Sequence, residues 1–230
     1  MSDNNPQMQP VFNTLPSSVV VLALAIFAVE VLFSLGTRGI VGGPGAVGWR
    51  LEAWTEFGFF APLLEQMVDR QEWFTSELKR FVTYPFVHLS FTHTVFVAVF
   101  LLALGKLVGE VMGNITVLVV FFASSIFGAL IYAGLTGDSR PLVGGYPGVY
   151  GLIGAYSFIL WVTLGTRGQS QWQAFSLIGI LMSIQLLFGL LFGAGNDWVA
   201  EFSGFLMGFA ISPILVPGGF SRLLNKMRQR

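Results

Sequence analysis

The sequence contains few side chains that could perform acid–base or metal chemistry. Only two histidines are present, His88 and His93, and cysteine is absent. Two residues five positions apart on a helix point about 140° away from each other, which argues against a metal ion shared by both imidazoles. The lack of cysteine excludes disulfides and thiolate metal ligands. We therefore expect no metal and no cofactor, and interpret both histidines as hydrogen-bonded interior groups.

Two acidic residues, Glu30 and Glu201, lie within apolar stretches of the sequence. An acid at such a position costs about 2.5–3.5 kcal/mol on membrane-insertion scales, so it is a functional candidate by default. The simpler interpretation of Glu201 is a neutral carboxylic acid that is hydrogen-bonded in the protein interior. For Glu30 it is an acid near a helix end or facing other helices.

Nucleophilic catalysis would need a serine activated by a histidine base, because the chain has no cysteine. The candidate nucleophiles in or beside apolar stretches are Ser90, Ser157, Ser183 and Ser203. Both histidines belong to one short stretch of the chain, which leaves few arrangements in which either could activate a distant serine. A catalytic pair formed by one of these serines and one of the two histidines is therefore the weaker hypothesis.

These residues belong to a chain with the composition of a membrane protein. Hydrophobic residues make up 54% of its 230 residues and charged residues only 10%, unlike a soluble domain. A helix needs about 20 mostly apolar residues to span a bilayer. Six stretches predict an all-α polytopic membrane protein: 17–35, 85–111, 115–135, 148–164, 175–192 and 198–216.

The expected organisation is a polar tail over 1–16, one transmembrane domain over 17–216 and a basic tail over 217–230. We interpret the first apolar stretch as a retained span, because it is longer than a signal-peptide core and lacks a small-residue cleavage pattern. The last segment carries four basic residues and no acid, a bias that favours the cytoplasm. Six spans then place both termini in the cytoplasm.

A long segment, 36–80, separates the first two spans. It combines seven tryptophan and phenylalanine residues with five basic and six acidic residues, a mixture typical of the lipid headgroup region. We expect part of it to lie on the membrane surface. Over the whole chain 12 basic residues balance 12 acidic ones, so there is no net positive charge that would attract nucleic acid. The expected partners are the lipid bilayer and other transmembrane proteins or helices.

Three stretches resemble motifs of the rhomboid intramembrane serine proteases, in the family's order and on separate spans. In the first family stretch, an arginine and a threonine precede a His-X-Ser-X-X-His segment, and a glycine and a glutamate close the helix. The matching residues here are Arg80, Thr83, His88, Ser90, His93, Gly105, Glu110 and Gly113. The second, 144–155, aligns without a gap on the family's Gly-X-Ser-Gly-X-X-Tyr-Gly-Leu-X-Gly stretch, and the third, 201–208, on its His-X-X-Gly-X-X-X-Gly pattern. The resemblance implies the family's six-helix, rhomboid-like bundle.

The resemblance also implies that the family's catalytic pair is missing. Tyr146 stands at the serine position, Glu201 at the histidine position and Pro147 at the glycine that follows the serine. Of the oxyanion-stabilising positions, His93 matches the family, whereas Val97 replaces an asparagine. Proline also lacks the backbone N–H that would help to stabilise an oxyanion. We therefore expect no catalytic residue here.

The glycines of these motifs have a structural explanation. Gly204 and Gly208 form a Gly-X-X-X-Gly face, which lets two membrane helices approach closely. We expect Gly148, Gly151 and Gly154 to serve the same helix packing.

The function that we expect is that of a rhomboid-like pseudoprotease, which binds transmembrane partners in an accessory, assembly or quality-control role. The alternative is a divergent rhomboid-family intramembrane serine-type endopeptidase. A transporter or channel is a third hypothesis, which the scarcity of intramembrane charges and the lack of an inverted repeat disfavour. The expected location of this multi-pass protein is the bacterial plasma (inner) membrane.

The resemblance also predicts a contact, because the family's serine and histidine meet. Tyr146 and Glu201 should therefore face each other. Since an unpaired carboxylate is disfavoured in a dry interior, we expect a protonated Glu201 within about 3.2 Å of the Tyr146 hydroxyl, or a charged Glu201 beside a protonated His93. The tyrosine ring should also occupy space that a peptide substrate would need.

Overall fold

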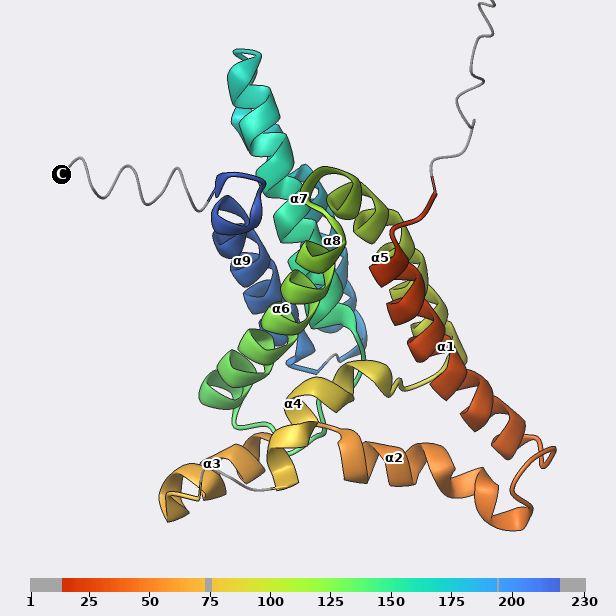
Figure 1. Ribbon diagram of the computed structural model, residues 1–230. Helices are drawn as coiled ribbons and strands as arrows, with labels where there is room; N and C mark the ends of the chain where they lie inside the picture. The colour runs from red at the N-terminus through yellow and green to blue at the C-terminus, as the bar shows by residue number, and fades with distance from the viewer. Residues whose placement is uncertain (1–13, 73–75, 194, 220–230) are drawn as a thin grey trace, which may run out of the picture.

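The computed structural model describes residues 14–72, 76–193 and 195–219, and almost all regular structure within them is helical. The helices that are long and apolar enough to cross a membrane are α1 (Ser17–Thr37), α5 (Phe91–Met112), α6 (Asn114–Thr136), α7 (Tyr146–Thr166), α8 (Ser176–Phe192, extended by the short helix η4, Gln171–Phe175) and α9 (Asp197–Leu215). They form an all-α bundle (Figure 1). This confirms the predicted fold class, and the chain is a multi-pass integral membrane protein. Most of the expected tails, 1–16 and 217–230, lies outside the described residues.

The second span was predicted to begin at Pro85, but its helix begins at Phe91. Pro85 lies in the short helix η3 (Tyr84–Phe86). The chain becomes α-helical only after Ser90, whose hydroxyl accepts the backbone N–H of His93 at 3.2 Å and so caps α5. The other five spans agree with their predicted bounds to within two residues at each end.

The segment between the first two spans folds across one end of the bundle (Figure 1). It contains the helices α2 (Trp49–Phe57), α3 (Ala61–Arg70) and α4 (Arg80–Thr83), with the short helices η1 (Pro44–Gly48) and η2 (Ser76–Lys79). Arg80 holds it together by donating to the carbonyls of Thr55 at 2.7 Å and Gly58 at 2.8 Å. Its position suits a segment that lies at the membrane surface.

The tightest packing in the bundle joins α7 to α9. A Cβ at Gly208 would lie 2.0 Å from the carbonyl oxygen of Gly151, and a Cβ at Gly204 would lie 2.2 Å from that of Pro147. At Gly154 it would lie 2.2 Å from the carbonyl oxygen of Phe205. The two helix backbones are therefore in direct contact, because only glycine leaves room for this approach.

A second close contact joins α7 to α6. A Cβ at Gly151 would lie 2.1 Å from the hydroxyl oxygen of Ser124, and one at Gly148 would lie 2.6 Å from the Phe121 ring. Helix α7 is thus enclosed by α6 and α9, and most of its first half is buried. This fixes the start of α7, where Tyr146 lies.

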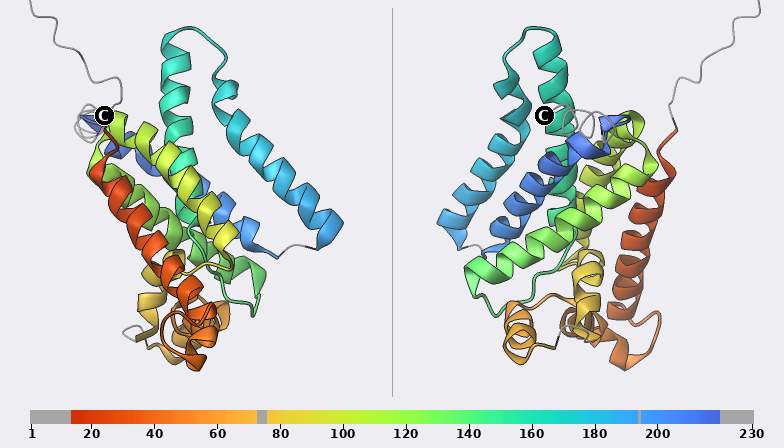
Figure 2. Two further views of the ribbon diagram at one scale, coloured as in Figure 1. Left: turned by 90° about the vertical axis from the view of Figure 1, so that its right-hand side faces the viewer. Right: turned by 60° about the vertical axis from the view of Figure 1, so that its left-hand side comes forward.

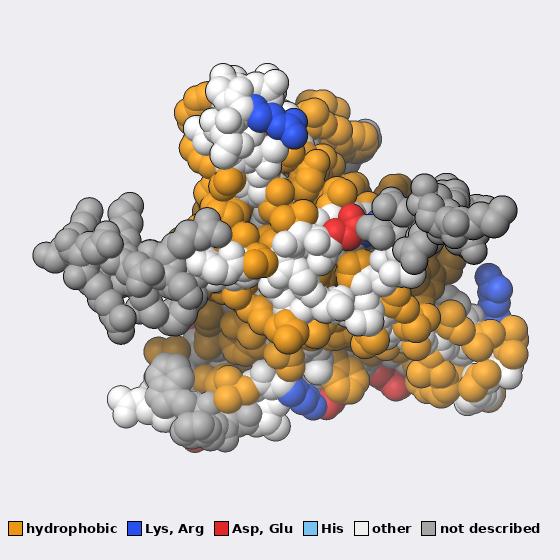
Figure 3. Space-filling view, turned by 45° about the horizontal axis from the view of Figure 1, so that its top comes forward, with side chains coloured by type: hydrophobic (Ala, Val, Ile, Leu, Met, Phe, Trp, Pro, Cys, Tyr) orange, Lys and Arg blue, Asp and Glu red, His pale blue; other side chains and the backbone are white. Residues whose placement is uncertain are grey.

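Helix α8 stands apart from this compact core (Figure 2, left). Only 11% of its span is buried within the protein, whereas 39–50% of each other span is buried. Hydrophobic side chains also cover much of the face seen in Figure 3, with only a few charged groups among them. Lipid must therefore solvate most of α8.

The contact between α7 and α9 predicts that one added methyl group strongly lowers the stability of the protein. In Gly208→Ala the new carbon meets the Gly151 carbonyl, so the helices must separate. Overpacking of this kind costs about 1–3 kcal/mol, and we expect a lower thermal unfolding temperature in detergent. The matched control is Gly179→Ala on α8, because nothing lies within 4 Å of a Cβ there. Equal destabilisation by the two substitutions would contradict this account.

Candidate functional site

Three residues singled out from the sequence come together where α5, α7 and α9 meet. His93 from α5, Tyr146 from α7 and Glu201 from α9 line one cavity of about 270 Å³. Gln185 from α8 and Asp197 from α9 line the same cavity. Residues from four spans therefore form one polar site inside an apolar bundle.

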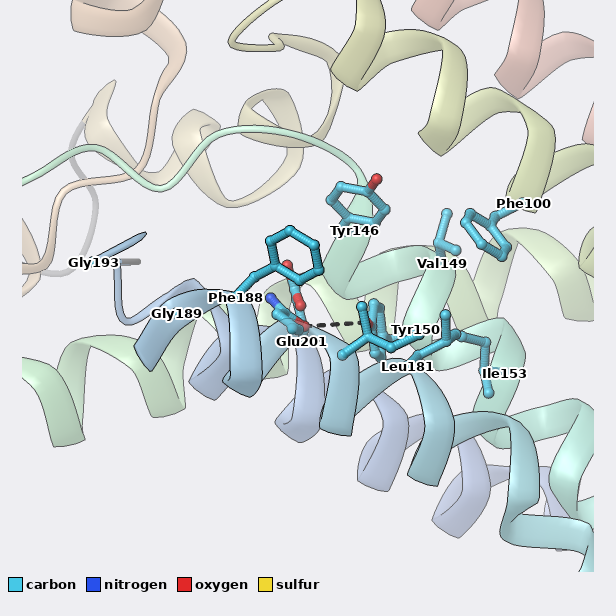
Figure 4. A pocket seen from close by; sticks show the side chains of 12 residues that line it. Phe100, Tyr146, Val149, Tyr150, Ile153, Leu181, Phe188, Gly189, Gly193 and Glu201 are labelled. Atoms are coloured by element: carbon cyan, nitrogen blue, oxygen red, sulfur yellow. Dashed lines mark hydrogen bonds between the residues drawn. The ribbon is translucent and has the colours of Figure 1, made fainter. Parts of the chain in front are cut away.

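The Tyr146 ring lies on the imidazole of His93. Their ring centroids are 4.9 Å apart and the planes differ by 21°, so the two rings are stacked. The Tyr146 hydroxyl points away from Glu201 (Figure 4). The expected hydrogen bond between Tyr146 and Glu201 is therefore not formed among the described residues, and Glu201 makes no ion pair with His93 there. Stacking directs the phenol away from α9, although both residues line the same cavity.

Glu201 is buried, and one of its carboxyl oxygens has no hydrogen-bond partner among the described residues. The residue is 5% exposed, and the oxygen without a partner is Oε2. Gln185 is near enough to be a side-chain hydrogen-bond partner of the carboxyl group. The Tyr150 hydroxyl in turn donates to Gln185 Oε1 at 3.2 Å, the dashed line in Figure 4. A chain of polar groups thus leads from α7 through α8 to α9.

Three polar residues of this region, Gln185, Tyr150 and Asp197, were not predicted from the sequence as site residues. Gln185 could have been found, because an amide within an otherwise apolar span is as unusual as an acid. Tyr150 occupies the tyrosine position of the second stretch that resembles the family, but only the fold shows its partner Gln185. Asp197 lies one helical turn before Glu201, at the start of α9.

His88 supports the start of α7. It is 1% exposed, and its Nε2 accepts the backbone N–H of Gly145 at 3.3 Å. Burial, together with the neighbouring His93, lowers the pKa of His88 to about 3. The imidazole is therefore neutral at physiological pH and can act as this acceptor.

Glu30 lies away from the cavity, in a complete hydrogen-bond network. Its carboxylate accepts two bonds from Arg50, at 2.6 and 2.9 Å, one from Thr94 at 2.9 Å and one from Ser34 at 3.0 Å. Arg50 also donates to the carbonyl oxygen of His88 at 2.9 Å. The network joins α1, α2 and α5 to the loop that carries His88.

The candidate serines take no part in a catalytic arrangement. Among the described residues, no serine hydroxyl is hydrogen-bonded to either imidazole: Ser90 caps α5, Ser183 donates to the carbonyl of Gly179, and Ser157 Oγ is buried without a partner. Ser203 is also buried. Val97 is fully buried, so an aliphatic side chain packs where the family has an amide.

The described residues offer no cluster of three or more histidine or acidic side chains that could hold a metal ion. What the site does offer is hydrogen bonding. Two buried atoms, His93 Nε2 and Glu201 Oε2, have no partner in the described part of the chain, and both residues line the same cavity.

A larger, mainly apolar groove adjoins this cavity. It has a volume of about 600 Å³ and is lined by α5, α7, α8 and α9, with Phe100, Leu181 and Phe188 among its walls (Figure 4). Tyr146 and Glu201 line both the groove and the cavity. The groove therefore connects the polar site with the loosely packed helix α8.

A family model of the Rhomboid domain matches residues 75–218 of this chain, which is more than half of its length. The match includes all three stretches that resemble rhomboid motifs, and it spans α5 to α9. Among curated proteins none matches the chain.

The Glu30 network predicts that the stability of the protein depends strongly on Arg50. In Arg50→Met the buried carboxylate loses its counter-charge, which costs about 3–5 kcal/mol, so the protein should unfold at a lower temperature in detergent. The double variant Glu30→Gln/Arg50→Met should recover most of this loss, because no charge is left unpaired.

The control is Lys79→Met, which removes the exposed ion pair between Lys79 and Glu56. A pair in water contributes little, so this variant should unfold close to the wild type. An Arg50→Met protein as stable as Lys79→Met would show that Glu30 does not depend on its network.

Proposed function

The chain belongs to the rhomboid family, and on that premise we propose that it is a pseudoprotease, which binds transmembrane segments of other proteins. The observation that carries the proposal is the stacking of Tyr146 on His93. Where the family has its small serine, an aromatic ring covers the histidine that would stabilise an oxyanion. No serine among the described residues lines the cavity to act as a nucleophile, and the Tyr146 ring lies over His93.

The other replacements support the same proposal. Glu201 stands in place of the base, and its buried carboxyl faces Gln185 rather than a serine. Val97 brings no hydrogen-bond donor, and Pro147 has no backbone N–H. Stabilisation of an oxyanion needs donors aimed at the developing charge. Three of the groups that would supply base and donors are therefore absent together.

The groove beside α8 supports a role in binding. It is apolar and large enough for side chains of another helix, and α8 has few internal contacts to lose if it moves. Such a groove is suited to transmembrane segments in an accessory, assembly or quality-control role. The alternative of a divergent serine-type endopeptidase would require a nucleophile that the described cavity does not contain.

We further propose that both termini are cytoplasmic, in the plasma (inner) membrane of a bacterium. The first turn of α1 and the last turn of α9 lie at the same end of the bundle (Figure 1), and basic residues follow α9 in the sequence. A reporter enzyme that is active only in the cytoplasm should therefore be active when it is fused after Arg230. A reporter that is active only outside the membrane would reverse the orientation.

The proposal predicts a protein without serine-dependent chemistry. A fluorophosphonate that reacts with activated serines should not label the purified protein in detergent, and a transmembrane substrate should stay intact. The variant Tyr146→Ser/Glu201→His should not regain full activity, because Pro147 and Val97 still impair the oxyanion site. If the wild type is labelled, loss of labelling in Ser157→Ala or Ser203→Ala would identify a nucleophile and establish the endopeptidase alternative.

A further inference from the structure

The carboxyl group of Glu201 lacks a hydrogen-bond partner in the described part of the chain. Its Oε2 is buried and unpartnered, and the residue lies where the polar cavity and the apolar groove adjoin. A buried polar group without a hydrogen bond costs free energy, and a buried charge without a partner costs more. For the ionised carboxyl group, the missing partner is a hydrogen-bond donor or a cation that enters from one of these two spaces.

The neighbours of Glu201 fix which group is missing. Gln185 Oε1 already accepts the Tyr150 hydroxyl, so the amide N–H₂ of Gln185 is the end available to the Glu201 carboxyl. Even with Gln185 beside the carboxyl group, Oε2 has no hydrogen-bond partner among the described residues. Asp197, which lines the cavity one turn away, is another acid and cannot donate when ionised.

Among the described residues, no lysine or arginine forms an ion pair with Glu201. Arg140 is the basic residue near this end of α9, and it is bound to Asp138 at 2.6 Å. The charge of Arg140 also acts on Asp197, so Glu201 is the acid of this site that has no basic partner among the described residues. The carboxylate of Glu201 is therefore complementary to a cation that the described residues do not supply.

The groove determines what kind of molecule can bring that cation. Its walls are apolar or aromatic, with Phe100, Leu181, Phe188 and Tyr150 among them, so the molecule must itself be apolar along most of its length. Aromatic walls also favour an ammonium or guanidinium group. A transmembrane helix with one basic side chain has both properties, whereas lipid acyl chains have no donor.

We propose that the groove selects transmembrane segments that carry a lysine or arginine at the depth of Glu201, whose carboxylate pairs with that side chain. This inference rests on the proposed function, because it names the class of segment that the groove binds. An acid and a base are each costly within a bilayer. Pairing them relieves both costs, so a basic segment gains more from the groove than an apolar one does.

The position of Glu201 in α9 sets the depth of the basic residue. Glu201 is the fifth residue of the helix, so it lies about 6 Å from the helix start. The partner's lysine or arginine should therefore lie about one helical turn inside its span, at the end of the membrane where α9 begins. A basic residue at the middle of the segment would not reach the carboxylate.

The test uses binding of synthetic helices to the full chain in phosphatidylcholine nanodiscs. Because the chain lacks cysteine, Gln169→Cys in the exposed turn between α7 and α8 provides a single site for a donor dye. Three acceptor-labelled leucine–alanine peptides of spanning length are compared by energy transfer. One has a lysine one turn from its end, one has it at the centre, and one has leucine only.

The lysine near the end should strengthen binding about tenfold or more over the leucine peptide, and the central lysine should not. In Glu201→Gln this advantage should vanish while the leucine peptide still binds, which also shows that the variant is folded. Glu201→Lys should reverse the preference toward a peptide with glutamate at the same position. Asp197→Asn serves as the control on the neighbouring acid and should retain the preference.

The outcomes separate this inference from the proposed function. Equal binding of the lysine and leucine peptides overturns the inference and leaves the proposed function standing, since water in the cavity would then satisfy Glu201. Loss of the preference in Asp197→Asn but not in Glu201→Gln also overturns it. If no peptide binds the wild type, the proposed function itself fails.

Discussion

In the core of a bilayer there is no water to satisfy polar groups, and the Glu30 network is where this constraint organises the fold. Glu30 binds Arg50, which holds the carbonyl of His88. His88 accepts the N–H of Gly145, one residue before α7 begins. A buried carboxylate in the first span thus sets the position of the fourth span through a surface segment and a neutral imidazole.

Glu30 and Glu201 show how differently one residue type can be used in the same bundle. All the oxygens of Glu30 are bonded within the chain, whereas Glu201 keeps one free oxygen beside a cavity. Completing Glu30 rigidifies the helices around it, because removing any partner exposes a costly charge. Leaving Glu201 incomplete gives the protein a group that another molecule can satisfy. On our proposal, Glu30 stabilises the fold and Glu201 binds a partner.

The sequence was sufficient for the six spans, because each needs only a local run of apolar residues. It also placed Tyr146, Glu201 and His93 in one region through the family resemblance. It could not predict how they interact, since the stacking of Tyr146 on His93 depends on two helices far apart in the chain. The partner of Glu30 was hidden for the same reason: Arg50 lies in a segment whose path only the fold defines. The start of α5 after Ser90 was a local signal that could have been used.

The isolation of α8 makes the surrounding lipid part of the protein's energetics. Within a membrane there is no hydrophobic driving force between helices, because acyl chains are as apolar as leucine. On our proposal, acyl chains and a transmembrane partner would compete for the same surface of α8 and the groove beside it. Ordered, tightly packed acyl chains would be easier to displace from such an irregular surface than fluid ones that conform to it. If the groove binds a partner as proposed, the fluidity of the host membrane would therefore change its occupancy, because α8 is loosely packed.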